Sequence, residues 1–149
     1  MDSDTVKHLE FIQSVVTRMN ANSFQLKGWA IAVYSALLAL FASSDGNELY
    51  LYMTVVPILL FWFLDTYYLQ QERKFRGIYN DVANLSNEST KISVKLFEMP
   101  IQKYNGGKYS YWNVMWSRTV WPLYVTMIGI AVLCAILSSL RSCGVNLCR

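Results

Sequence analysis

The stretch 49–76, LYLYMTVVPILLFWFLDTYYLQQERKFR, constrains the fold more than any other part of the chain. At about 1.5 Å per helical residue, its first part, 49–69, is about 30 Å long, the thickness of the hydrocarbon core of a bilayer. That part is apolar or aromatic except at Thr54, Asp65 and Thr66. The residues QQERKFR that follow contain no Gly or Pro, so the same helix is expected to continue into water over 70–84.

Two further stretches have the length and composition of membrane spans. They are 24–43, FQLKGWAIAVYSALLALFAS, and 119–140, TVWPLYVTMIGIAVLCAILSSL. Charged residues make up only 15% of the chain, against about 25% in a soluble domain. The sequence therefore predicts a single all-α membrane domain with three transmembrane helices, the first two forming a hairpin around the short acidic turn 44–48.

The orientation of these spans follows from the distribution of Lys and Arg, which favour the cytoplasmic flanks of membrane helices. The segments 1–27 and 70–118 together contain 11 of the 13 basic residues, and the tail 141–149 contains the other two. We therefore predict a multi-pass protein of the cell inner membrane, with its N-terminus in the cytoplasm and its C-terminus outside.

The segment 4–23 is predicted to form an amphipathic helix. Its apolar residues recur every three or four positions, which is the spacing of one helix face. The sequence leaves open whether this face lies at the membrane interface, packs in an oligomer or covers the protein's own cytoplasmic loop. Asn and Ser favour turns and caps, so a kink is expected before the first span. The apolar residues are Val6, Leu9, Ile12, Val16 and Met19, and the predicted kink lies at Asn20, Asn22 and Ser23.

The cytoplasmic loop and interfacial segment 85–117 contain one alternating stretch, ISVKLFEMP, which predicts a short β-strand that ends at Pro100. Aromatic residues then crowd the start of the third span, as in the aromatic belts of membrane proteins. They are Tyr109, Tyr111, Trp112, Trp116 and Trp121.

The external tail 141–149 holds Cys143 and Cys148. An oxidising compartment would allow a disulfide between them. Free thiols and an intermolecular bridge are the alternatives that the sequence leaves open.

Small residues four positions apart form rows in the first and third spans. Such rows let helix backbones approach closely, which is how helices associate in lipid. The second span has no such row. We therefore expect the first and third spans to be packing surfaces in a homo-oligomeric protein and the second span to face lipid more than they do. The rows are Gly28, Ala32 and Ala36, with Ser35, Ala39 and Ser43 beside them, and Ala131, Ala135 and Ser139.

Asp65 is the most distinctive single residue, because an unpaired charge inside an apolar span costs a few kcal/mol. Lys27 and Arg118 open the first and third spans at the same predicted level. We predict a structural or gating charge cluster of Asp65, Lys27 and Arg118. The alternative is a proton or cation site at Asp65.

Enzymatic chemistry is not expected. The chain has one histidine, His8, for which a surface role is expected, and its cysteine spacing fits no zinc pattern. Phosphate-cradling, dinucleotide and hydrolase motifs are absent from the sequence, so no metal or cofactor is predicted. Acidic residues dilute the basic loop, so nucleic acid is not an expected partner; they are Asp81, Glu88 and Glu98.

The segments RMNANSF and QQERKFRGIYND, together with the hairpin between them, resemble the SLATT-type small bacterial membrane effectors over about residues 5–85. This resemblance implies an oligomeric effector, linked to antiviral nucleotide signalling, that permeabilises the inner membrane when triggered. The third span and the Cys143–Cys148 tail depart from that two-span pattern. The resemblance assigns no functional residues.

These features together predict a pore-forming or membrane-disrupting effector in antiviral defence, triggered through its cytoplasmic helix and loop. Its expected partners are the lipid bilayer, further copies of itself, and a cytoplasmic protein or nucleotide-type ligand. A non-conducting anchor or accessory subunit that recruits a cytoplasmic partner is the alternative. A transporter that uses Asp65 is the third hypothesis.

Overall fold

The computed structural model describes residues 3–44, 49–89 and 91–147, with side chains described as far as Arg141. Over these residues the chain is all-helical and contains no strand. The predicted helical class is confirmed, and three helices are long and apolar enough to cross a membrane, which fits a multi-pass membrane protein. The helices are α1 (Ser3–Ser43), α2 (Leu49–Val82), α3 (Tyr111–Met115) and α4 (Trp121–Leu147), with 3-10 turns η1 (Ile101–Lys103) and η2 (Gly107–Tyr109).

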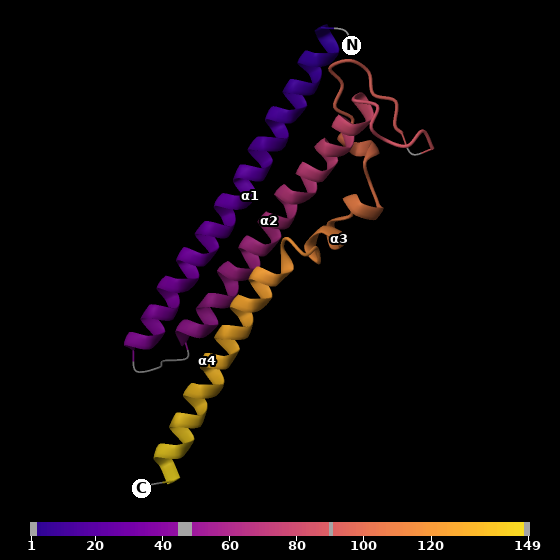
Figure 1. Cartoon of the computed structure of the whole chain (residues 1–149). Helices are drawn as coiled ribbons and strands as arrows, with labels where there is room; N and C mark the ends of the chain where they lie inside the picture. The colour runs from indigo at the N-terminus through magenta and orange to yellow at the C-terminus, as the bar shows by residue number, and fades with distance from the viewer. Residues whose placement is uncertain (1–2, 45–48, 90, 148–149) are drawn as a thin grey trace.

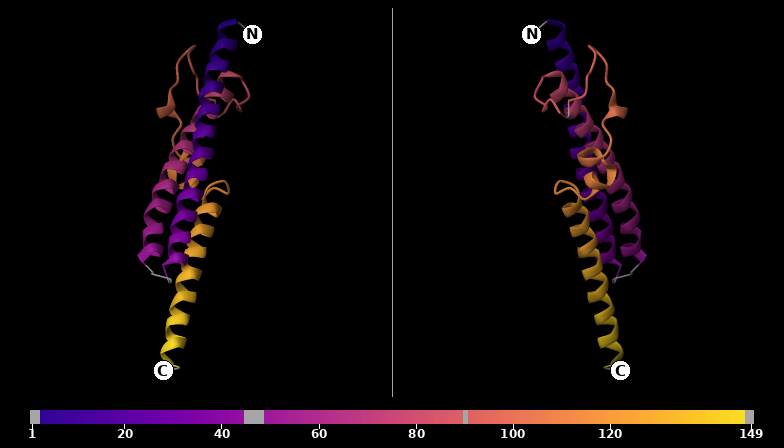
Figure 2. Two further views of the ribbon diagram at one scale, coloured as in Figure 1. Left: turned by 90° about the vertical axis from the view of Figure 1, so that its left-hand side faces the viewer. Right: turned by 90° about the vertical axis from the view of Figure 1, so that its right-hand side faces the viewer.

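The molecule is elongated and has two parts (Figure 1). Helices α1 and α2 form a long antiparallel hairpin, and α4 runs along α2 from its midpoint and past the hairpin turn (Figures 1 and 2). The N-terminus and the C-terminus lie at opposite ends. We call residues 3–22 and 70–110 the head, and residues 23–43, 49–69 and 121–141, which contain the apolar stretches, the stem.

Helix α2 is the central helix of the stem, which the small-residue rows did not predict, although its outer face remains exposed at Tyr52, Val56 and Leu60. It contacts both α1 and α4. Of its most apolar stretch 33% is buried, against 11% in α1 and 17% in α4. The reason is that large inward side chains of α2, Ile58, Trp62 and Leu69, fill the space between its neighbours. Close packing in this stem therefore depends on side-chain volume rather than on small residues alone.

The two small-residue rows of the first span form one strip on the outer face of α1. All of its members are exposed, and the space around Gly28 is open. The row in α4 behaves differently, because Ala131 is buried and Ala135 is half-buried against the rest of the stem. The outer strip of α1 consists of Gly28, Ala32, Ser35, Ala36, Ala39 and Ser43.

The predicted kink before the first span is wrong, because α1 is one unbroken helix through Asn20 and Ser23. Ser23 is buried and donates its hydroxyl hydrogen bond to Asp65 of α2. Ser usually interrupts helices because its hydroxyl forms hydrogen bonds with nearby backbone groups in place of the helix bonds. The hydroxyl of Ser23 is bonded to Asp65 instead, so the helix continues. The predicted amphipathic helix 4–23 therefore exists as the first half of α1.

The head has its own apolar core, formed where the start of α1 packs on the end of α2. Ile12 and Val15 of α1 meet Phe75 and Ile78 of α2, and Tyr104 closes this core from the loop. Among the readings of the amphipathic face, the structure supports the one in which it covers the protein's own loop. The loop also approaches α2 closely at Gly77. A Cβ at this position would lie 2.5 Å from the Tyr109 hydroxyl and 2.8 Å from the Tyr104 ring.

The strand predicted to end at Pro100 is absent from the structure, where the corresponding segment is irregular. Ile92 and Val94 pack against the head core. The alternation therefore reflects a loop that lies on the helix hairpin, without a partner strand to complete a ladder. The segment then makes a turn in which the amide of Glu98 donates to the Lys95 carbonyl at 3.0 Å, and Phe97 adopts a positive φ of 61°.

The third span begins at Trp121 rather than at 119, because residues 116–120 form turns. The predicted pairing of Cys143 with Cys148 lies outside the residues whose side chains are described.

Candidate functional site

Asp65 is fully buried in the stem and is the centre of a polar cluster that contains side chains from three helices. The Lys27 ammonium lies 2.7 Å from one carboxylate oxygen and 2.6 Å from the other. Ser23 donates to the first oxygen, and the Tyr124 hydroxyl donates to the second at 3.2 Å. The carboxylate is thus supplied with donors on both oxygens.

Each helix contributes to this cluster from a defined position. Ser23 and Lys27 are four residues apart on α1, so they share one helix face, and the Lys27 ammonium also donates to the Ser23 hydroxyl at 2.9 Å. Tyr124 lies in the first turn of α4, where its ring stacks on Trp62 of α2 at 5.9 Å between centroids. The cluster therefore joins α1, α2 and α4 at the level where the head meets the stem.

The electrostatics of the cluster favour a structural link. A buried carboxylate costs free energy unless opposite charge and hydrogen bonds compensate for its lost hydration. Here a bidentate ion pair and two hydroxyl donors provide that compensation, and Lys27 is itself only 21% exposed. Both Asp65 oxygens are engaged by side chains of the chain itself, an arrangement better suited to holding helices together than to binding a transported ion.

Arg118, the third predicted member, lies outside the cluster. Its side chain is exposed in the turn that precedes α4. Tyr124, six residues later in the chain, is the residue of this region that bonds to Asp65 instead. Tyr124 was missed because a tyrosine near the start of a span is also typical of an interfacial belt.

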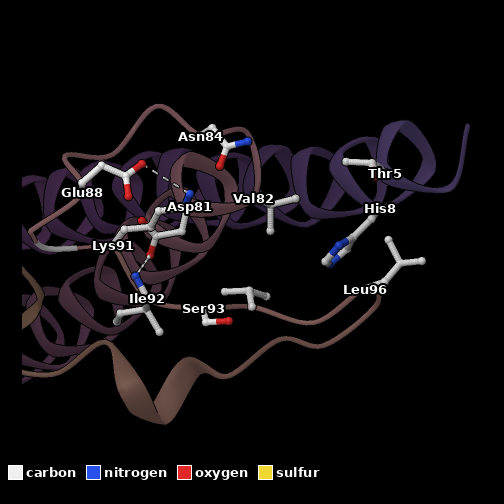
Figure 3. A pocket seen from close by; sticks show the side chains of 11 residues that line it. Thr5, His8, Asp81, Val82, Asn84, Glu88, Lys91, Ile92, Ser93 and Leu96 are labelled. Carbon is white, nitrogen blue, oxygen red and sulfur yellow. Dashed lines mark hydrogen bonds and ion pairs between the residues drawn. The ribbon is translucent and has the colours of Figure 1, made fainter. Parts of the chain in front are cut away.

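A second candidate site is a cavity of about 570 Å³ in the head, between the start of α1, the end of α2 and the following loop (Figure 3). Asp81 forms one side of it and is well supplied with donors. The Tyr104 hydroxyl donates to an oxygen of Asp81, and the amide of Ile92 donates to the same oxygen at 3.3 Å. Burial, and then the bond to Asp81, raise the pKa of Tyr104 well above its ordinary value of 10.0.

His8 also lines this cavity, and the expectation of a surface role for it is wrong. It is 1% exposed. Its Nδ1 accepts a hydrogen bond from the amide of Phe97 at 3.4 Å, and its ring lies 5.6 Å from the Phe97 ring. Its Nε2 is buried without a hydrogen-bond partner among the described residues. The loop covers His8, and no pattern within 4–23 shows that a loop almost 90 residues later folds over this face.

Metal-binding potential is low in the part of the chain that the structure describes. No three side chains of His, Cys, Asp and Glu come together there in a way that could hold a metal ion. The Asp65 and Asp81 carboxylates, the central acids of the two sites, are used in hydrogen bonds and an ion pair instead.

Comparisons of the chain with protein-family models, with curated proteins and with solved structures found no match. Its function is therefore inferred from the geometry of the stem and of the head.

Proposed function

We propose that this protein is a small effector of the bacterial inner membrane that assembles with copies of itself and permeabilises the bilayer when its head is triggered. The head would lie in the cytoplasm, as the distribution of basic residues predicts. The trigger would be a cytoplasmic protein or a small ligand. A role in antiviral defence follows only from the resemblance to SLATT-type effectors and is part of this proposal.

The observation that carries the proposal is the outward strip of small residues on α1. The chain does not use this strip for its own packing, since Gly28, Ala32 and Ala36 are all exposed. In lipid, a smooth strip of small residues favours close approach of a second helix. The large apolar side chains Trp29 and Leu40 flank the strip and are 64% and 48% exposed. They would add packing area around such a contact.

The route from trigger to membrane is supported by the continuity of the helices. Helices α1 and α2 each run from the head into the stem without a break. A change in the packing of the head core therefore moves the same helices that carry the outward strip. No separate hinge or linker is needed between the two parts.

Two glycines that differ only in position test this proposal. Gly28 on α1 and Gly129 on α4 are both exposed in the stem, with open space around the Cβ position. Gly28→Leu should reduce cross-linked oligomers and restore membrane potential in cells that overexpress the protein. Gly129→Leu should leave both unchanged. Polarised cells containing fully assembled wild-type protein would overturn the pore-forming function.

A non-conducting anchor is the second candidate, and one observation favours it. Hydroxyl groups of the stem bond inward to the helix backbone, as Thr54 does to the Leu51 carbonyl at 2.6 Å and Thr66 to the Trp62 carbonyl at 2.7 Å. The outward surface of the stem that remains is mainly apolar. A soluble protein that copurifies in stoichiometric amount, without any loss of membrane potential, would support the anchor.

Transport through Asp65 is the weakest of the three hypotheses, because its carboxylate is already occupied by Lys27, Ser23 and Tyr124. Asp65→Asn separates the alternatives. Loss of assembly indicates a structural link, whereas loss of ion flux with intact assembly indicates a transport site.

A further inference from the structure

His8, which lines the head cavity, has a hydrogen-bond donor that the protein itself does not use. Because Nδ1 of His8 accepts from the Phe97 amide, the neutral imidazole carries its proton on Nε2. That N–H group is buried and has no acceptor among the described residues. A buried donor without a partner destabilises the folded protein, so an acceptor at this position would be strongly favoured.

The size of the cavity fits a small organic molecule. Its volume of about 570 Å³ lies within the range of about 300–1,000 Å³ that is typical of ligand pockets. Figure 3 shows the His8 ring pointing from α1 toward the loop that forms the opposite wall. Four aliphatic side chains line the cavity beside the polar ones: Val82, Ile92, Val94 and Leu96.

The charges around the cavity restrict the class of ligand. Asp81 and Glu88 contribute two negative charges, and Lys91 contributes one positive charge. Lys91 is also paired with Glu88 at 3.8 Å. A phosphate compound, which carries several negative charges, would therefore meet net repulsion. A cation would find Asp81 already engaged by Tyr104 and Ile92.

We infer that the head cavity binds a small uncharged molecule with an apolar body and a carbonyl-type oxygen, an amide, ester or ketone, whose oxygen accepts the hydrogen bond of His8 Nε2. The inference concerns binding alone and does not depend on the proposed pore. A nucleotide-type trigger, if there is one, would therefore bind outside this cavity.

Access to Nε2 requires a small movement of the cavity wall, since this atom is covered in the unliganded protein. The Leu96 side chain is the part best able to move, because it lines the cavity and is 49% exposed, while the Phe97 amide stays bonded to His8 Nδ1. A ligand that enters beside Leu96 would exchange contact with water for contact with the aliphatic wall.

The single histidine of the chain makes the test direct. In nanodiscs, the ¹⁵N resonance of Nε2 in the full-length protein reports on His8 without assignment. Acetanilide, an uncharged amide with an apolar ring, should shift this resonance with a Kd on the order of 1 mM, as expected for a ligand of its size. Benzoate, which is similar in size but anionic, should bind about tenfold more weakly or not at all.

Two tryptophan variants locate the binding. Ser93 lines the cavity and is exposed, so Ser93→Trp should fill the space and abolish the acetanilide shift. Lys103 is also exposed and lies in the same loop but does not line the cavity, so Lys103→Trp should leave the shift unchanged. The inference is overturned if the wild-type resonance does not move at about 10 mM acetanilide, if benzoate binds more tightly, or if both variants respond alike.

Discussion

The head and the stem share helices α1 and α2 but expose different kinds of side chain to their surroundings. In the stem, large apolar residues point outward, such as Tyr52, Val56 and Leu60, which are 68%, 71% and 56% exposed. In the head, Ile12 and Ile78 are fully buried. Water favours the second arrangement because it expels apolar surface, whereas lipid accepts apolar surface and penalises unpaired polar groups.

The hydrogen bonds that hold each part together differ accordingly. In the stem, aromatic side chains donate to backbone carbonyls of neighbouring segments, as Tyr34 does to Met127 at 2.8 Å and Trp62 to Met115 at 3.4 Å. In the head, the central bond joins Tyr104 to the carboxylate of Asp81. Apolar burial stabilises the head directly, whereas a stem placed in lipid would depend more on packing and on such specific bonds. Variants at the junction, in the head and at its central bond test this difference.

The largest effect is expected at the junction, where Asp65 joins three helices. Asp65→Leu leaves the ammonium of Lys27 without its buried partner, and breaking a buried ion pair from one side costs about 3 kcal/mol or more. The expected result is a lower free energy of unfolding in detergent and a loss of contact between α4 and the hairpin. The double variant Lys27→Met/Asp65→Leu should recover most of the loss. If the single variant unfolds like the wild type, the junction does not hold the stem together.

An intermediate effect, confined to the head, is expected for Gly77→Ala. The added methyl group would collide with Tyr104 and Tyr109, and overpacking of this kind costs about 1–3 kcal/mol. Hydrogen exchange should increase at Ile12 and Ile78 while the stem stays protected. Gly28→Ala is the matched control, because the space around Gly28 is open. Equal effects of the two substitutions would show that helix propensity, and not the close approach at Gly77, is being measured.

The smallest effect is expected for Tyr104→Phe, which removes one donor from Asp81 and should cost about 1–2 kcal/mol. Tyr109→Phe is the control, since the Tyr109 hydroxyl makes no hydrogen bond within the described residues. Folding raises the pKa of Tyr104 above 10.0, so the folded head holds this proton more tightly than the unfolded chain. The wild-type head should therefore lose stability above pH 10.0, and Tyr104→Phe should reduce that loss. Unfolding curves at pH 8 and pH 11 would measure the difference.

Local and compositional signals predicted the parts of the fold that depend on them. The length of 49–69 and the uncharged run in 119–140 predict spans, and the structure has helices there. Asp65 and Lys27 could be paired from the sequence because they are the ionisable residues at one end of adjacent antiparallel spans. The extension beyond the second span also follows from local propensity, and α2 continues to Val82.

The errors arose where a distant partner decides the local structure. Ser23 is of a residue type that favours a kink, but its hydroxyl donates a hydrogen bond to Asp65, which lies 42 residues later in the chain. The alternation of Ile92 and Val94 resembles a strand, but it reflects packing on the head core. His8 is covered by Phe97, a contact across 89 residues. Periodicity within a short window contains no information about such contacts, so the head cavity could not be predicted.

Because α1 is one unbroken helix, it can tilt as a rigid unit about the point where it is bonded to Asp65. Ser23 and Lys27 fix it to Asp65 near its middle, with an arm of about 30 Å on the head side and about 24 Å on the stem side, at 1.5 Å per residue. Tilting about this point moves the two ends in opposite directions and by similar amounts. A displacement of His8 toward a ligand would thus swing the far end of α1, and the small residues along it, by nearly the same distance the other way.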